Sequence, residues 1–183
     1  MGTKFREIFN YVIASTSIYE VINMVKQAVS MITEMDTAMT NLRKVAEGTT
    51  EQFNSFKDAS FGIAKQTGST ATSVVDAATE WARLGYSLED SSKLAQTSIV
   101  YSNVGELDAA TATTDLVSAL KAFDIEAENA MHVVDVMNEI GNNYAISSAQ
   151  IGEVLEKSSS SLAVSGDDLE HVTAMAAAMN EVI

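Results

Sequence analysis

The sequence predicts an all-α protein, in which a long N-terminal helix is followed by stacked α-hairpins that form a helical bundle. Apolar residues recur every three or four positions, and the alternating pattern of β-strands is absent. The chain of 183 residues contains no proline, the residue that most often breaks a helix. With 46% hydrophobic and 20% charged residues, the composition supports a buried core rather than disorder.

The first predicted helix is the longest, from about Phe5 to Val45, and Gly48 ends it. At 1.5 Å per residue, a helix of about 40 residues is about 60 Å long, which exceeds the usual diameter of a domain. Spacings of three and four give it a heptad seam with one irregular step near Ile32, and we expect this seam to mediate self-association. The seam comprises Ile18, Ile22, Val25, Val29, Ile32, Met35, Met39 and Leu42.

The shorter helices that follow begin at residues that cap helix N-termini. Thr49 and Ser147 each precede a glutamine by three residues, which predicts a capping box. These signals divide the chain into an arm at 1–48 and a helical-hairpin domain at 49–183, which we expect to be truncated at its C-terminal end. The other predicted starts are Ser69 or Thr70, Ser87, Asp108, the turn at 124–129 and the turn at 166–168, and the predicted ends are Gly68, Gly85, Asn103 and Phe123.

A weak repeat indicates how the helices are arranged. Leu84–Asp90, Phe123–Asn129 and Val164–Glu170 each have an apolar residue, a turn and an acidic first helical turn, at offsets of 39 and 41 residues. This is the length of an α-hairpin, so residues 84–183 are predicted to stack as hairpins. The acidic residues complement the positive N-terminal ends of the helices.

Four residues are predicted to shape the hairpin corners. Trp81 is interpreted as an aromatic anchor between hairpins, with an exposed binding residue as the alternative. Gly85 follows the last helical residue, where a left-handed conformation favours glycine. Gly105 interrupts the helix that starts at Ser87, and Phe123 closes the apolar stripe of the next helix.

Charge and composition exclude several classes of function. The net charge is −14, and residues 84–183 carry −13 of it, so we expect no binding to the nucleic-acid backbone. The absence of cysteine excludes disulfides and thiolate-bound metals. The longest uncharged run near the start, Ile8–Tyr19, is too short to cross a bilayer, so we expect no membrane segment in this chain.

Three patterns that could carry chemistry are better explained by ordinary helices. Calcium-loop spacing would also need glycine where Asn129 stands. His132 and His171 are the only histidines, and the S-x-x-K pattern of Ser118 and Lys121 lacks its companion motifs. We therefore expect no catalytic residue, no cofactor and no metal, and hence no enzyme. The calcium-like spacing comes from Asp124, Glu126, Glu128 and Asp135.

Several motifs in fixed order resemble the conserved domain of phage tail tape measure proteins, over roughly residues 50–183. Each motif alone is a helix end of low specificity, whereas their order and spacing together are specific. The motifs are Trp81–Ser87, Asn103–Ala109, Ala122–Phe123, Ala130–Asp135, Ala145–Ile151, Glu153–Leu155 and Leu162–Asn180.

The resemblance implies a structural virion protein that acts in tail assembly, tail-length determination and genome delivery, without catalysis. It implies as partners other copies, joined through the N-terminal helix, and other tail or tail-chaperone proteins. It places the protein in the phage tail, or in the cytoplasm of the bacterial host during assembly. We also expect the chain to be a piece of a longer protein. The competing hypothesis is an acidic helical interaction domain of a host protein, such as an adaptor or signalling protein.

Overall fold

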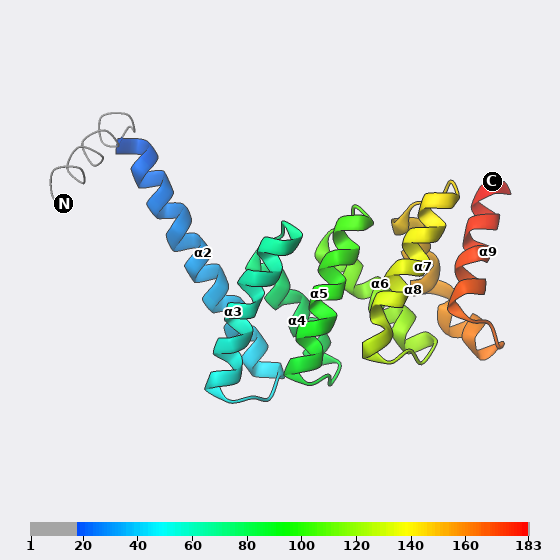
Figure 1. The fold of residues 1–183 in the computed structure, drawn as a ribbon, viewed down its shortest axis with the longest axis horizontal. Coiled ribbons are helices and arrows are strands. Elements are labelled where there is room, and N and C mark those ends of the chain that lie inside the picture. Colours follow the sequence, from blue (N-terminus) through cyan, green and yellow to red (C-terminus); the bar gives the residue numbers. More distant parts are fainter. Residues whose placement is uncertain (1–17, 183) are drawn as a thin grey trace. The chain divides into compact units, whose positions relative to one another are not determined.

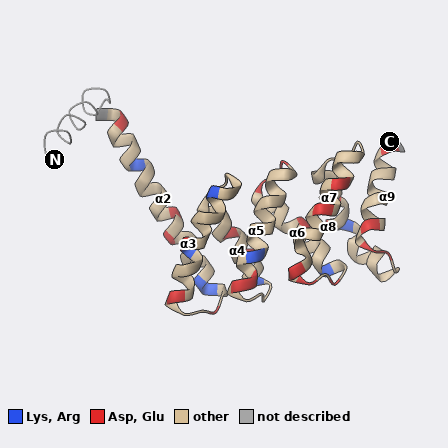
Figure 2. Ribbon diagram, in the orientation of Figure 1, with Lys and Arg blue, Asp and Glu red and all other residues tan. Residues whose placement is uncertain are grey.

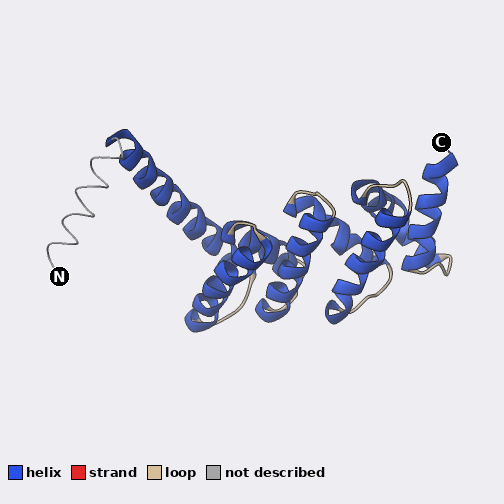
Figure 3. Cartoon of the chain, turned by 45° about the horizontal axis from the view of Figure 1, so that its top comes forward, coloured by secondary structure: helices blue, strands red, loops and turns tan. Residues whose placement is uncertain are grey.

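A computed structural model describes residues 18–182, and all regular structure in this range is helical (Figures 1 and 3). The all-α prediction is therefore confirmed. The part of the predicted first helix that precedes Ile18 lies outside the described residues. The helices are α2 (Ile18–Val45), α3 (Thr50–Thr67), α4 (Ala71–Arg83), α5 (Leu88–Val104), α6 (Ala109–Ala122), the 3₁₀ helix η1 (Ala127–Asn129), α7 (Ala130–Asn143), α8 (Ser148–Val164) and α9 (Leu169–Val182).

The chain divides into two compact units between Thr37 and Ala38, within helix α2. The last two turns of α2 therefore belong to the second unit, where Met39 and Leu42 are 4% and 0% exposed. The domain boundary predicted at residues 48 and 49 stays a prediction from the sequence.

The second unit is a stack of helices in chain order. From α3 onward, each helix packs against the next one and also against the next but one. Figures 1 and 3 show this succession from α3 to α9. Such a stack is held together by contacts between neighbouring elements, as in helical repeat proteins. Its largest fully buried side chains include Trp81, Leu94, Tyr101, Leu116, Met137, Ile151 and Leu155.

Five corners of this stack are built in the same way. The helix ends at a residue in the left-handed conformation, and the next N–H donates a hydrogen bond to the carbonyl five residues earlier. This is the Schellman arrangement, which satisfies carbonyls that the helix end leaves unpaired. The left-handed residues are Gly68, Gly85, Glu106, Asp124 and Gly166, and the corresponding bonds are Ser69 to Ala64, Tyr86 to Trp81, Leu107 to Ser102, Ile125 to Leu120 and Asp167 to Leu162, at 2.9–3.4 Å.

The residue two positions after each left-handed residue starts the next helix. Thr70 and Ser87 each accept a hydrogen bond from the backbone N–H three residues later, and Asp108 accepts from the N–H groups of Ala110 and Thr111. Asp168 accepts one from the N–H of His171 at 2.8 Å. Helix end, reversal and helix start therefore fit into three residues, which explains why the weak repeat is visible in the sequence.

Gly105 has a different role from the other corner glycines. Its φ is −89°, and the left-handed residue at this corner is the following one, Glu106. A Cβ on Gly105 would lie 2.9 Å from the Cβ of Ser148 and 3.0 Å from the carbonyl oxygen of Tyr101. Glycine is thus needed here because the end of α5 approaches the start of α8 closely.

Trp81 lies in the core at the corner between α4 and α5, with 1% of its surface exposed. Its indole Nε1–H donates a hydrogen bond to Ser98 Oγ at 3.0 Å. The ring of Tyr86 meets the indole edge to face, with centroids 5.5 Å apart. Phe123 caps the C-terminal end of α6 and packs, partly buried, against the same core.

Replacing Gly85 by alanine should destabilise the protein by about 1 kcal/mol, because a Cβ is disfavoured at φ 93°. Gly62 is the matched control, since it is exposed within α3 and a Cβ there would meet nothing within 4 Å. Gly62→Ala should stabilise the protein by about 0.5–1 kcal/mol. Urea denaturation measures both changes, and equal effects of the two substitutions would contradict the corner described here.

Candidate interaction site

Helix α2 exposes a continuous apolar face to solvent from Val21 to Ile32. We call this the α2 apolar face. At 3.6 residues per turn its members fall on one side of the helix, while Asn23, Lys26, Gln27 and Ser30 fall on the other. The exposed fractions range from 44% at Ile22 to 69% at Met31. The face consists of Val21, Ile22, Met24, Val25, Val29, Met31 and Ile32.

Polar side chains of α2 form hydrogen bonds to other groups of the same helix. Ser30 Oγ donates to Glu34 Oε1 at 2.7 Å, and Thr33 and Thr37 donate to carbonyls one turn earlier. The helix therefore needs no partner for its polar groups, whereas its apolar side remains in water. An exposed apolar face of this extent is typical of an interaction surface.

The structure divides the seam predicted from the heptad spacing. Ile22, Val25, Val29 and Ile32 lie on the α2 apolar face and are at least 44% exposed. Met39 and Leu42, by contrast, are buried in the second unit. The side chain of Ile18 lies outside the described part of the chain. The described part of the seam that is free to bind a partner therefore extends from Ile22 to Ile32.

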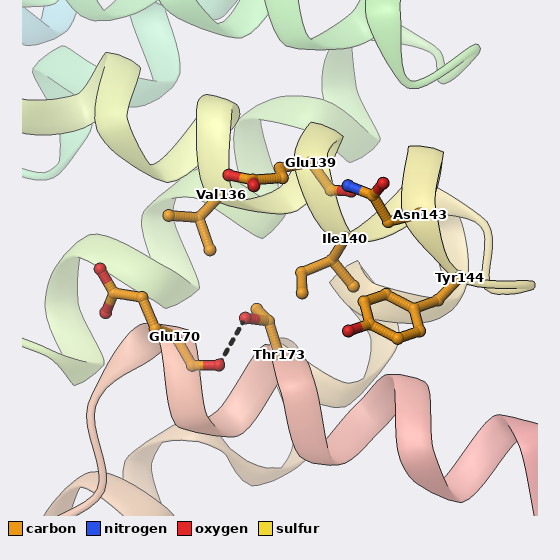
Figure 4. A pocket seen from close by; sticks show the side chains of 7 residues that line it. All are labelled: Val136, Glu139, Ile140, Asn143, Tyr144, Glu170 and Thr173. Carbon is orange, nitrogen blue, oxygen red and sulfur yellow. Dashed lines mark hydrogen bonds between the residues drawn. The ribbon is translucent and has the colours of Figure 1, made fainter.

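A surface groove of about 540 Å³ lies between α7 and α9 (Figure 4). Val136 and Ile140 point from α7 toward α9, where the Thr173 hydroxyl donates to the Glu170 carbonyl at 3.1 Å. The Glu170 carboxylate in turn contacts His132 Nε2 at 2.9 Å. The groove thus combines an apolar floor with carboxylates at its edge, which suits a cationic side chain. Its lining is Val136, Glu139, Ile140, Asn143, Tyr144, Glu170 and Thr173.

A polar cluster lies buried where α5, α6 and α8 meet, and the sequence analysis did not predict it. Asp115 of α6 is 3% exposed, and its Oδ2 has no hydrogen-bond partner. The Tyr101 hydroxyl donates a hydrogen bond to the carbonyl oxygen of Ser148 at 3.3 Å, and it also interacts with the Asp115 carboxyl. A Cβ on Gly152 of α8 would lie 2.7 Å from Asp115 Oδ1 and closer still to Oδ2.

Burial raises the pKa of Asp115 to about 6, and the negative charges of Glu156 and Asp108 add to the shift. Burial also raises the pKa of the Tyr101 hydroxyl well above its ordinary value. Two signals in the sequence could have revealed this cluster. Asp115 falls on the apolar stripe of its helix, beside Leu116, and Gly152 stands inside a predicted helix.

The residues with calcium-loop spacing serve other purposes in the structure. Asp124 is the left-handed residue of a corner, and Glu126 precedes η1. His171 Nδ1 contacts Asp167 Oδ1 at 2.6 Å, and Ser118 Oγ donates to the Thr114 carbonyl at 3.0 Å.

Among residues 18–182, no group of three or more His, Asp or Glu side chains is placed to hold a metal ion. Within the same range, no helix is long and apolar enough to span a membrane.

In the second unit, acidic residues greatly outnumber basic ones, as Figure 2 shows for α5 to α9. Residues 84–183 contain only three lysines, Lys93, Lys121 and Lys157, and no arginine. Lys93 and Lys157 each pair with a glutamate one turn earlier. The second unit therefore presents a strongly negative surface, while α2 presents an apolar one.

These features define a class of protein, namely an all-α module with an exposed amphipathic helix. Residues 57–182 match the sequence profile of the phage-related minor tail protein family, which covers more than half of the chain. The chain therefore belongs to this family, and its role is a structural one in a phage tail. No solved structure matches the chain. The matched range begins within α3, so it leaves out the α2 apolar face.

Gly152→Ala should destabilise the protein by about 1–3 kcal/mol, because the new methyl group would overlap the Asp115 carboxyl. Asp115→Ala removes the overlap, so the double variant should lose less than the sum of the single losses, with a coupling energy of about 0.5–3 kcal/mol. Gly141→Ala is the control, since its Cβ would meet ordinary contacts at 3.6 Å and beyond. Urea denaturation of the four variants tests this, and strictly additive losses would contradict the contact.

Proposed function

We propose that this chain is a tape-measure-type structural module of a phage tail. In this role it contributes to tail assembly, to the determination of tail length and to genome delivery, and it acts without catalysis. Membership of the minor tail protein family supports a place in the tail. The resemblance of Trp81–Ser87 and the later motifs to tape measure proteins supports the more specific role.

The observation that carries this proposal is the α2 apolar face. Seven large apolar side chains of one helix are exposed along about three turns. A protein that must assemble in the tail needs such a surface, and we propose that it binds the same face of other copies. Other tail or tail-chaperone proteins are the further partners of this helix.

The distribution of charge supports contact through α2. Residues 1–83 carry a net charge of −1, whereas residues 84–183 carry −13. Copies that met through their second units would therefore repel each other more strongly than copies that met through α2. The available seam is short, because about ten residues from Ile22 to Ile32 span about 15 Å. We therefore expect a weak association, which neighbouring tail proteins would reinforce.

Introducing glutamates at Val25 and Val29 in the full chain should abolish self-association, because both side chains lie on the α2 apolar face. The matched control places glutamates at Gln27 and Ser30, which adds the same charge to the opposite side of the same helix. Sedimentation velocity at several concentrations measures the effect. We expect the wild type and the control to associate with rising concentration, and the Val25/Val29 variant to remain monomeric.

Two results would contradict self-association through this face. One is a wild-type chain that stays monomeric at all concentrations. The other is equal disruption by the test and control variants, which would mean that added charge rather than the face is responsible.

The tape-measure role predicts that tail length follows the length of this helix. Deleting Val21–Glu34 from the phage gene removes two heptads and preserves the heptad phase. At 1.5 Å per residue, the 14 deleted residues should shorten assembled tails by about 21 Å. Electron microscopy of tails averaged over many particles measures this change. Intact tails of unchanged length would contradict the tape-measure role while leaving the place in the tail untouched.

A further inference from the structure

The Asp115 carboxyl is buried between three helices without a positive charge to balance it. Its exposed fraction is 3%, and Oδ2 has no hydrogen-bond partner. Burying a carboxylate without a cation or a full set of donors is costly. Such a group requires an explanation, since an apolar side chain would fill the same space without this cost.

The charged and titratable groups around Asp115 cannot neutralise it. The group that faces it from α5 is Tyr101, the group from α8 is Glu156, and the group from its own helix is Asp108. Both charged neighbours are acidic and raise its pKa. Helices α4 and α7 also pack on α6, and of the described residues neither helix supplies a charge that acts on this carboxyl.

The Tyr101 hydroxyl lies between two acceptors but has a single proton to donate. It donates to the carbonyl oxygen of Ser148, in the first turn of α8, at 3.3 Å, and it also interacts with the Asp115 carboxyl. A protonated Asp115 can donate to the Tyr101 oxygen, which leaves the Tyr101 proton for the Ser148 carbonyl. An ionised Asp115 competes for that proton and still leaves one of its own oxygens without a donor.

The packing on α8 prevents the carboxyl from turning away. The position of a Cβ on Gly152 is already filled by Asp115, with Oδ1 only 2.7 Å from it. Glu156 lies one turn after Gly152 on α8, where it is exposed, and its negative charge acts on Asp115. Ionisation therefore acts directly on the contact between α6 and α8.

We propose that Asp115 is a proton-controlled latch between α6 and α8. In the protonated state, hydrogen bonds run from Asp115 to Tyr101 and from Tyr101 to the Ser148 carbonyl, and they hold the three helices together. When the proton leaves to solvent, an unpaired buried charge faces Glu156, and the contact between α6 and α8 loosens. The latch is independent of the role proposed for α2.

The direction of the pH dependence follows from the raised pKa. A carboxyl whose pKa rises from 3.8 in the unfolded chain to about 6 in the folded one binds its proton more tightly when folded. The protonated Asp115 carboxyl therefore makes its full contribution to the free energy of unfolding below about pH 4, and this contribution is lost as the pH rises through about 6. The latch is closed in acid and released near neutral pH.

Asp115→Asn tests the latch, because an amide can donate to Tyr101 as the protonated acid does but cannot ionise. Asp135→Asn is the control, since Asp135 is exposed and the substitution changes the net charge by the same amount. Urea denaturation of the full chain is measured from pH 4.5 to 7.5. At pH 7.5 the unfolding equilibrium constant of Asp115→Asn should be about 100-fold smaller than that of the wild type, and the difference should shrink to about sixfold at pH 4.5.

Amide hydrogen exchange at one fixed pH provides the local measurement. At pH 7.5, amides of α6 and α8 should exchange more slowly in Asp115→Asn than in the wild type, and amides of α3 should not differ. Equal pH profiles for Asp115→Asn and Asp135→Asn would overturn the proposal, as would an Asp115→Asn variant that is less stable than the wild type at pH 7.5. If Asp115→Asn fails to fold, carbon NMR titration of the Asp115 carboxyl in the wild type decides. A midpoint above 5 supports the latch, and an ordinary midpoint near 4 overturns it.

Discussion

The second unit depends on one backbone feature, a left-handed residue followed two positions later by a helix cap. At the five connections that use this corner, the chain reverses within three residues, so the following helix lies directly beside the preceding one. The order of packing in the stack then follows the order of the sequence, with most contacts between helices that are one or two places apart. Glycine removes the cost of the left-handed conformation at Gly68, Gly85 and Gly166, whereas Glu106 and Asp124 adopt it with a side chain present.

This way of packing explains why the chain has two surfaces of opposite character. The helices from α3 to α9 bury their apolar sides against each other, and the last turns of α2 add Met39 and Leu42 to that unit. From Val21 to Ile32, α2 keeps its apolar side in solvent, whereas Met35 is buried. The family match covers residues 57–182, and hence the stack rather than the α2 apolar face. The stack is thus the part that matches the family, and the α2 apolar face is the surface that we propose for assembly.

Much of the fold could be predicted from the sequence, because it is encoded locally. Capping boxes at Thr49 and Ser147 are present as predicted, since the spacing of a hydroxyl and a glutamine is sufficient to form them. The left-handed conformation of Gly85 was also predicted, because this glycine follows the last helical residue. The left-handed conformation of Glu106 was not predicted, because a glutamate gives no local sign of it. The break in the helix was assigned to the neighbouring Gly105 instead.

The features that could not be predicted depend on contacts between distant segments. The close approach of Gly105 to Ser148 joins positions 43 residues apart, and the contact of Asp115 with Gly152 joins positions 37 apart. The division of the α2 seam has the same origin. Heptad spacing places Ile22 and Leu42 on one stripe, but only tertiary packing decides that Leu42 is buried while Ile22 stays exposed.

The central claim is that residues 38–182 form a self-contained stack, while the preceding turns of α2 need a partner. Hydrogen exchange of the full chain, followed by mass spectrometry at low and high protein concentration, tests this most directly. We expect the amides of the stack to be protected equally at both concentrations, and those of residues 18–37 to become protected only at the higher one. Protection of residues 18–37 that equals that of the stack and does not change with concentration would contradict the claim.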